Sequence, residues 1–138
     1  MIHSNICGPI SLPSLSGCLF YVLFIDDHSR KSWIYFLKAK SETFDRFKEF
    51  KALIENQTGR HIHILRSDNE GEYESNEFDD FCQEARIKRE LIVCYNPQWN
   101  GVAGRNNRMV CEAAKAMLHY QDLFASLWEE ATNTTVYI

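Results

Sequence analysis

The amino-acid sequence predicts an α/β domain built on a central mixed five-stranded sheet flanked by helices. Three strand-like segments come first, helices and strands then alternate, and two helices end the chain. This order is typical of a sheet with helices on both faces. The chain has 138 residues, 45% of them hydrophobic, and shows no linker, internal repeat or low-complexity tract. Residues 1–138 are therefore expected to form a single domain.

The first three strands are predicted by apolar runs that lie between loop-forming residues. Residues 3–6 form a short first segment. Residues 20–25 are a continuous run of apolar, aromatic and β-branched side chains, which favours a buried strand. Residues 32–37 form the next strand. The polar segment 26–30 between them is expected to be a hairpin connection, with Asp27 near Arg30.

The first helix is predicted to begin at a cap residue, Ser41, and to end at Thr58 and Gly59. Four apolar residues recur at three- and four-residue intervals and define its buried face: Phe44, Phe47, Phe50 and Ile54.

The strand after this helix is predicted from the period-two alternation of residues 61–65, and it is expected to extend to Ser67. Alternation puts His61 and His63 on one face of that strand. Two such histidines can bind a metal ion, but an exposed strand face is the favoured interpretation.

The second half of the chain is predicted to contain three helices and one strand. Asn76 is a candidate cap for a helix with apolar residues at positions i, i+3, i+4 and i+7. A strand over residues 90–93 and a loop over 96–101 follow. A long helix with residues 109–117 on its inner side, and a last helix over 123–136, complete the order.

Composition restricts the class of protein. The net charge is −4, with 19 acidic and 15 basic residues, which argues against a protein that coats nucleic acid and leaves room for local phosphate contacts. No apolar run reaches the roughly 18 residues of a membrane span. The first residues do not resemble a signal peptide, so an intracellular protein is expected. Five cysteines without a CxxC pair favour reduced thiols over a zinc site or disulfides.

Four motifs follow one another along the chain: residues 3–9 (HSNICGP), 24–30 (FIDDHSR), 66–73 (RSDNEGEY) and 96–105 (NPQWNGVAGR). Together they resemble the integrase core of copia-type LTR retrotransposons, in which the corresponding runs are roughly HSDxCGP, FxDDxSR, RSDNGxEY and TPQxNGVxER. The resemblance covers essentially the whole chain, and four long motifs in register make it specific.

This resemblance implies an RNase H-like fold, together with DNA 3′-end processing and strand transfer by two divalent cations, Mg²⁺ or Mn²⁺. In-line displacement at a phosphodiester needs one cation to activate the attacking hydroxyl and one to stabilise the leaving oxygen. Hard oxygen ligands hold such cations, and Mg²⁺ takes few of them from the protein. The family provides two aspartates on strands and one glutamate on a helix.

The match of these three positions is incomplete. Asp68 corresponds to the second aspartate and is the candidate catalytic and metal-binding residue. The first aspartate falls on Asn5 and the glutamate falls on Gly104, with the family's interval from Asp68 kept. An amide has no charge and glycine has no side chain, so metal binding is expected to be weak or lost, and the reaction with it.

Other charged residues near these motifs are weaker candidates. Glu70 stands where the family has glycine and adds a carboxylate close to Asp68, but rescue of metal binding by Glu70 is disfavoured. Asp26 and Asp27 belong to the family pattern in addition to its metal ligands. Two arginines, Arg105 and Arg108, lie one helix turn apart and are candidates for contact with a DNA backbone. A solvated helix face explains them equally well.

Three functions stay open at this point: an inactive integrase core by descent, a binding module for nucleic acid or for a second copy, and a decayed fragment without function. The expected partners are DNA, as element ends and as target, and a second copy of the core through its helices. A functional protein is expected in the nucleus. The chain lacks the family's N-terminal zinc-binding part and C-terminal DNA-binding part, so complete integration is not expected of this domain alone.

Overall fold

Strand β1 (Ile2–Cys7) is the central strand of a five-stranded sheet with the order β3-β2-β1-β4-β5. The computed structural model describes residues 1–7, 14, 16–68, 76–92 and 128–137. The other four strands are β2 (Phe20–Asp26), β3 (Ser32–Leu37), β4 (Ile64–Asp68) and β5 (Lys88–Ile92).

The sheet is mixed, as the sequence predicts. β1 pairs with β2 in an antiparallel sense and with β4 in a parallel sense. β3 extends the antiparallel side and β5 extends the parallel side. β1 is therefore the strand at which the direction of pairing changes. It brings together segments that are far apart in the sequence.

β2 is buried, which confirms the prediction made from its continuous apolar run, and the structure shows that both of its faces are covered. Val22 and Phe24 belong to the hydrophobic core cluster that also contains residues of the helices. Tyr21, Leu23 and Ile25 alternate with them and are equally buried. A strand with both faces covered has no position for a polar side chain, and this explains the unbroken apolar run.

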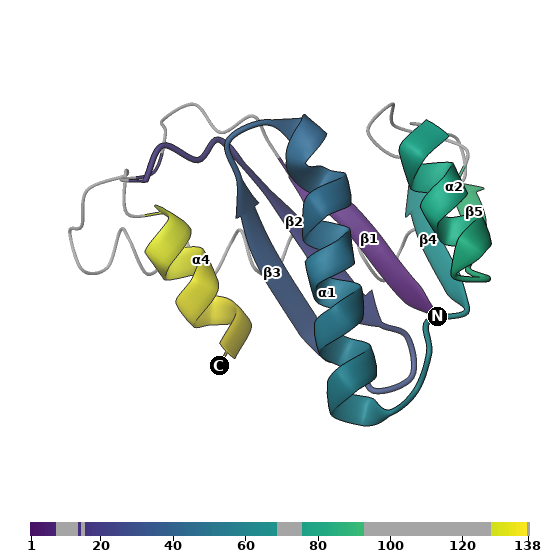
Figure 1. The fold of residues 1–138 in the computed structure, drawn as a ribbon. Helices are drawn as coiled ribbons and strands as arrows, with labels where there is room; N and C mark the ends of the chain where they lie inside the picture. The colour runs from purple at the N-terminus through teal and green to yellow at the C-terminus, as the bar shows by residue number, and fades with distance from the viewer. Residues whose placement is uncertain (8–13, 15, 69–75, 93–127, 138) are drawn as a thin grey trace.

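Helices α1 (Thr43–Thr58) and α2 (Asn76–Glu84) lie on one face of the sheet (Figure 1). α1 contributes Phe47 and Phe50, both 0% exposed. The Phe50 ring stacks on Phe24 of β2 with 4.6 Å between ring centroids. Phe78 of α2 stacks on Phe47 at 5.3 Å. These aromatic contacts join both helices and the sheet into one core.

The start of α1 differs from the prediction. Ser41 lies within a short 3₁₀ helix, η1 (Lys40–Glu42), and does not cap α1. The hydroxyl of Thr43 donates to the carbonyl of Lys40 over 2.7 Å, which stabilises this tighter turn before the α-helix begins. The end of α1 is as predicted: Gly59 follows Thr58 with φ 69° and donates its N–H to the carbonyl of Glu55.

The strand predicted to begin at His61 begins at Ile64. The carboxylate of Glu55, near the end of α1, accepts a hydrogen bond from the backbone N–H of Ile62 over 2.8 Å and lies 3.4 Å from Nδ1 of His61. That N–H is therefore bound to α1 and not to a neighbouring strand. His61 and His63 are both exposed, in agreement with the favoured prediction of an exposed face.

Helix α4 (Trp128–Tyr137) lies beside β3 and contacts it (Figure 1). Its Glu129 accepts a hydrogen bond of 2.6 Å from the hydroxyl of Ser14, a residue buried before β2. Ala131 is 4% exposed, as expected of an anchor of the last helix. The first residues predicted for this helix, 123–127, and the long helix before it lie outside the described residues.

Candidate functional site

Asn5 and Asp68 lie on neighbouring parallel strands. β1 and β4 pair with Ile2 opposite Leu65 and His3 opposite Arg66. The same register continued by two residues would put Asn5, two residues before the end of β1, opposite Asp68, the last residue of β4. Residues directly opposite one another across a ladder project from the same face of the sheet. The fold therefore brings two of the three expected site positions together.

The side-chain chemistry at these positions does not fit a pair of divalent cations. Asn5, which is half-buried, offers a neutral amide oxygen. The backbone of Asp68 is described as the last residue of β4, and its side chain lies outside the description. Two strongly hydrated cations need several carboxylates to replace their water, and Asn5 provides none.

The remaining site predictions fall outside the described part of the chain. These are Gly104, Arg105, Arg108 and Glu70. Within the described ranges, no three His, Cys, Asp or Glu side chains gather as a metal site would require. Cys18 and Cys82 are buried free thiols, and burial raises the pKa of the Cys82 thiol.

A second polar row crosses the same face of the sheet, two residues before Asn5 and Asp68. It consists of His3 on β1, Arg66 on β4 and Glu90 on β5, since His3 is paired with Arg66 and Arg66 with Glu90. Nε and Nη2 of Arg66 both donate to Oε2 of Glu90, over 3.0 and 2.7 Å. Both side chains are 28% exposed. This ion pair is only partly open to solvent.

His3 also contacts the hairpin that follows β2. Its Nε2 donates to Oδ1 of Asp27 over 2.8 Å, and Arg30 lies 3.8 Å from the same oxygen. The hydrogen bond from His3 lowers the pKa of Asp27 although burial raises it, and the charge of Arg30 contributes further. The predicted proximity of Asp27 to Arg30 is confirmed, and the contact with His3 is an addition to it.

Asp26 stabilises the hairpin itself. Its carboxylate accepts hydrogen bonds from the backbone N–H groups of His28 and Ser29 and from the Ser29 hydroxyl. Burial raises its pKa, but these hydrogen bonds outweigh burial and the pKa is lowered. Asp26 and Asp27 therefore have structural partners in the turn.

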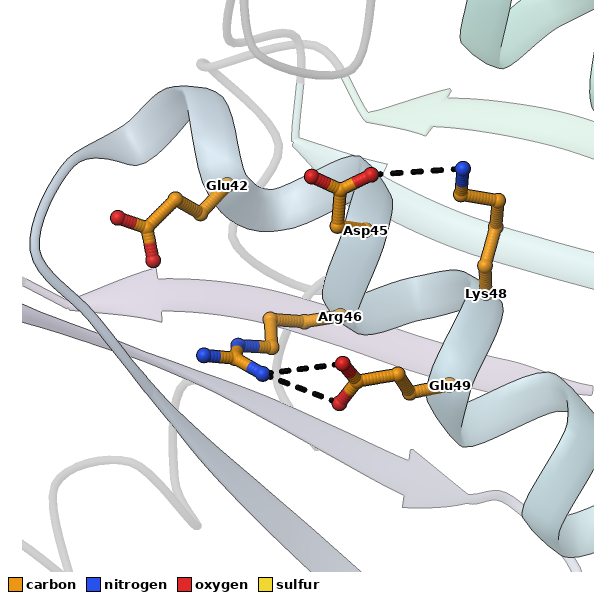
Figure 2. Close-up of a pocket in the computed structure, with 5 residues that line it drawn as sticks. All are labelled: Glu42, Asp45, Arg46, Lys48 and Glu49. Carbon is orange, nitrogen blue, oxygen red and sulfur yellow. Dashed lines mark hydrogen bonds and ion pairs between the residues drawn. The ribbon is translucent and has the colours of Figure 1, made fainter.

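A hollow of about 500 Å³ lies over the outer surface of α1, away from this polar face (Figure 2). Its five lining residues are all charged, and four of them pair along the helix: Arg46 with Glu49, and Lys48 with Asp45. Such i, i+3 pairs are typical of a solvated helix surface. None of its lining residues is one of the predicted site residues.

The sheet order, with two site positions on adjacent parallel strands, defines an RNase H-like core. The chain belongs to the integrase core domain family, whose model matches residues 6–97.

Relatives with similar sequences are retrovirus-related Pol polyproteins of plant transposons. The chain is 45% identical over 138 residues to that of transposon TNT 1-94 from Nicotiana tabacum, covering 100% of the chain and 10% of the polyprotein. It is 31% identical over 125 residues to that of transposon RE2 from Arabidopsis thaliana, covering 91% of the chain and 8% of the polyprotein. The chain thus spans about a tenth of the length of these relatives.

Solved structures with the same fold are retroviral integrases. One is the intasome of simian T-cell lymphotropic virus in complex with a PP2A regulatory subunit, with a TM-score of 0.74 and 17% identity over 99% of this chain and 46% of that one. Another is the HTLV-2 integrase catalytic core domain in complex with magnesium, in a trimeric form. Its TM-score is 0.66 and its identity 16%, over 99% of this chain and 81% of that one.

The Arg66–Glu90 pair is the part of the site that sequence reasoning missed. Strand alternation alone would have placed Arg66 on the face of Asp68, because the two residues are two apart. The identity of its partner depends on the register between β4 and β5, which no local pattern encodes.

Among the described residues, no helix has the length and apolar character needed to cross a membrane.

Proposed function

We propose that this chain is the integrase catalytic-core domain of a copia-type retrotransposon that has lost metal-dependent polynucleotidyl transfer. The observation that supports the proposal is the parallel pairing of β1 with β4, in which Ile2 lies opposite Leu65 and His3 opposite Arg66. The same register, continued by two residues, would put Asn5 opposite Asp68, and Asn5 has an amide where the family has an aspartate.

The physical argument for lost catalysis is electrostatic. A divalent cation leaves its hydration shell only for strong, preferably charged, oxygen ligands. Replacing two of three carboxylates removes two formal charges from a site that has to hold two such cations. Asp68 with an amide neighbour can hold one weakly bound cation, and this does not provide the two-cation arrangement that in-line displacement requires.

The partners proposed for this domain follow from the same descent. DNA is the partner, as element ends and as target, with Arg105 and Arg108 in contact with the phosphate backbone. A second copy of the core is a further partner, and the trimeric form of the HTLV-2 core supports self-association of such domains. The place of action is the nucleus, where the target DNA is.

A binding module that no longer cuts DNA is the second candidate, and the loss of charge at Asn5 and Gly104 favours it over an active enzyme. Phosphate contacts release counterions, so binding to DNA would weaken steeply as salt is raised. Filter binding over a salt series measures this slope. A flat, weak response would favour a fragment without function.

The proposed loss of catalysis is tested by restoring the two carboxylates. We expect no strand transfer from the 138-residue chain with Mg²⁺ or Mn²⁺, and measurable transfer after Asn5→Asp combined with Gly104→Glu. The matched control adds Asp68→Asn to the doubly restored chain and should abolish the regained activity. Robust transfer by the unaltered chain would show that the proposal is wrong.

A further inference from the structure

Three connections of the chain meet at one end of the sheet, opposite the end at which Asp68 closes β4 (Figure 1). They are the hairpin between β2 and β3, the segment between α1 and β4, and the turn between α2 and β5. The pairing of the strands places them side by side, because β2 ends and β1, β4 and β5 begin at this end. The backbone N–H of Lys88 also donates to the carbonyl of His63 over 2.8 Å, which joins the last two connections directly.

These connections carry five exposed, positively charged side chains, which together are called the basic end: Arg30, Lys31, Arg60, Arg86 and Lys88. Within the described ranges, Lys31, Arg60 and Arg86 form no ion pair. The other two make only long contacts, Arg30 at 3.8 Å from Asp27 and Lys88 at 3.9 Å from Glu90. The basic end therefore keeps charge that carboxylates do not neutralise.

The carboxylates near the basic end are mostly bound to other groups. Asp26 accepts hydrogen bonds within the hairpin, and Asp27 accepts one from the buried histidine of β1. Glu55 is 2.6 Å from the ammonium group of Lys51. Glu84, the last residue of α2, adds one exposed negative charge. The cations still exceed these anions, although the whole chain has a net charge of −4.

The backbone at the basic end is unusual at two of its arginines. Arg30 has φ 62° and Arg86 has φ 59°, and among the described residues no other residue except glycine has a positive φ. Glycine adopts this conformation without the steric cost that a side chain brings. Arginine at both turns thus keeps a charge at the expense of backbone strain, and such strain is concentrated at functional sites.

A structural role explains only part of the basic end. Arg60 and Arg86 follow the C-terminal ends of α1 and α2, where a cation stabilises a helix through its dipole. Arg30 and Lys31 lie in a hairpin between two strands, and no helix ends there. The charge of the hairpin is therefore left without a structural reason.

We propose that the basic end binds the phosphodiester backbone of DNA, at the end of the sheet away from Asn5 and Asp68. The inference rests on the proposed function, because it takes DNA as the partner. Neighbouring strands lie about 4.8 Å apart, so the cations extend over roughly 15 to 20 Å from the start of β3 to the start of β5. A duplex presents several phosphates over such a distance. Contacts of this kind position a protein on DNA without reading its sequence.

The test removes two charges together with the strained backbone conformation, by Arg30→Gly combined with Arg86→Gly in the 138-residue chain. Fluorescence anisotropy of a labelled duplex of about 20 base pairs measures binding over a salt series. We expect about tenfold weaker binding at about 50 mM salt, and a slope of log affinity against log salt that is smaller by about 2. The midpoint of thermal unfolding should stay the same or rise, because glycine relieves the strain.

A second variant removes charge from the basic end without touching the strained positions. Lys31→Gln with Lys88→Gln should weaken DNA binding to a similar extent and leave the midpoint of thermal unfolding unchanged. A lower midpoint with unchanged DNA binding, in either double variant, would mean that these cations serve only the fold, and this would overturn the inference.

The matched control removes two charges from the outer surface of α1, where both cations are paired with carboxylates. Arg46→Gln with Lys48→Gln alters the net charge by the same amount and should leave the salt slope unchanged. An equal loss of affinity in the control would mean that net charge alone decides binding, and this would overturn the inference.

The remaining outcomes separate this surface from the proposed function. If the variants of the basic end bind DNA as the unaltered chain does, the inference is wrong and DNA remains the partner of the domain. If the unaltered chain binds no DNA, both fail. Displacement of the labelled duplex by poly-glutamate at lower concentrations than by unlabelled duplex would assign the surface to acidic protein segments instead.

Discussion

Asp27 connects the hairpin after β2 to the central strand, because its carboxylate accepts a hydrogen bond from the buried ring of His3. Nδ1 of the same ring is buried without a partner among the described residues. Among the described contacts of the His3 ring, the hydrogen bond from Nε2 to Asp27 is therefore the one that offsets the burial of its polar atoms. Asp27 in turn is 40% exposed, so solvent reaches it and protons can exchange with it.

The contact between His3 and Asp27 predicts a pH-dependent contribution to stability. The hydrogen bond from His3 holds the pKa of Asp27 below the ordinary value of an aspartate. A carboxylate with a lowered pKa stabilises the fold above that value, and the contribution is lost as pH falls through the lowered pKa. Asp27→Asn should therefore lower the midpoint of thermal unfolding at pH 7.

The difference between wild type and Asp27→Asn should shrink below about pH 4, where the carboxylate of the unfolded chain becomes protonated. Asp45→Asn is the control, because that carboxylate is 72% exposed on α1. A constant difference from pH 7 to pH 3 would contradict the expected contribution of the Asp27 charge.

At the scale of elements, the end of α1 depends on one backbone conformation. Gly59 has φ 69°, in the left-handed region that L-residues with a side chain disfavour. An added Cβ would meet nothing within 4 Å, so the cost of a side chain at this position is conformational and not steric.

Gly59→Ala should therefore lower the free energy of unfolding by about 1 to 2 kcal/mol. Chemical denaturation followed by circular dichroism measures the change. Gln57→Ala, at an exposed position of the same helix end, is the control and should be within about 0.5 kcal/mol of wild type. An equal, small effect of both substitutions would mean that the turn after α1 adapts without strain.

Elements with a strong local pattern could be predicted from the sequence, and elements set by distant contacts could not. The apolar run of β2 and the spacing of the phenylalanines in α1 are enough to predict that these side chains are buried. The alternation around His61 is typical of a strand. The carboxylate of Glu55, however, accepts a hydrogen bond from the backbone N–H of Ile62, and β4 begins only at Ile64. β5 likewise begins at Lys88, two residues before its predicted start.

The same distinction holds for the candidate site. The adjacency of Asn5 and Asp68 followed from the family motifs, since the sequence distance between them gives no local signal. The Arg66–Glu90 contact and the His3–Asp27 contact each join residues 24 apart. Such contacts depend on strand register, and register is a property of the assembled sheet.

At the scale of the whole molecule, one continuous core connects the sheet to both helices that cover it. The cluster includes residues from β1, β2, β3, α1, β4 and α2. Phe24 is fully buried and its ring contacts Tyr35, Phe47 and Phe50. Because these contacts join β2 to both β3 and α1, loss of the ring should destabilise the domain as a unit.

Phe24→Ala should lower the free energy of unfolding by about 3 to 5 kcal/mol, through lost burial and the cavity left behind. Urea unfolding followed by circular dichroism and by tryptophan fluorescence should show one coincident transition. Leu53→Ala, at a position 40% exposed, should change stability by at most about 0.5 kcal/mol. Two separate transitions would mean that the core is not one cooperative unit.

The change of pairing direction at β1 has a consequence for a chain that is still being synthesised. β1 can pair with β2 as soon as the first hairpins have left the ribosome, but its other edge has no partner until β4 follows. An open strand edge invites pairing with foreign chains. That edge of β1 is covered only once β4 has been synthesised and pairs with it.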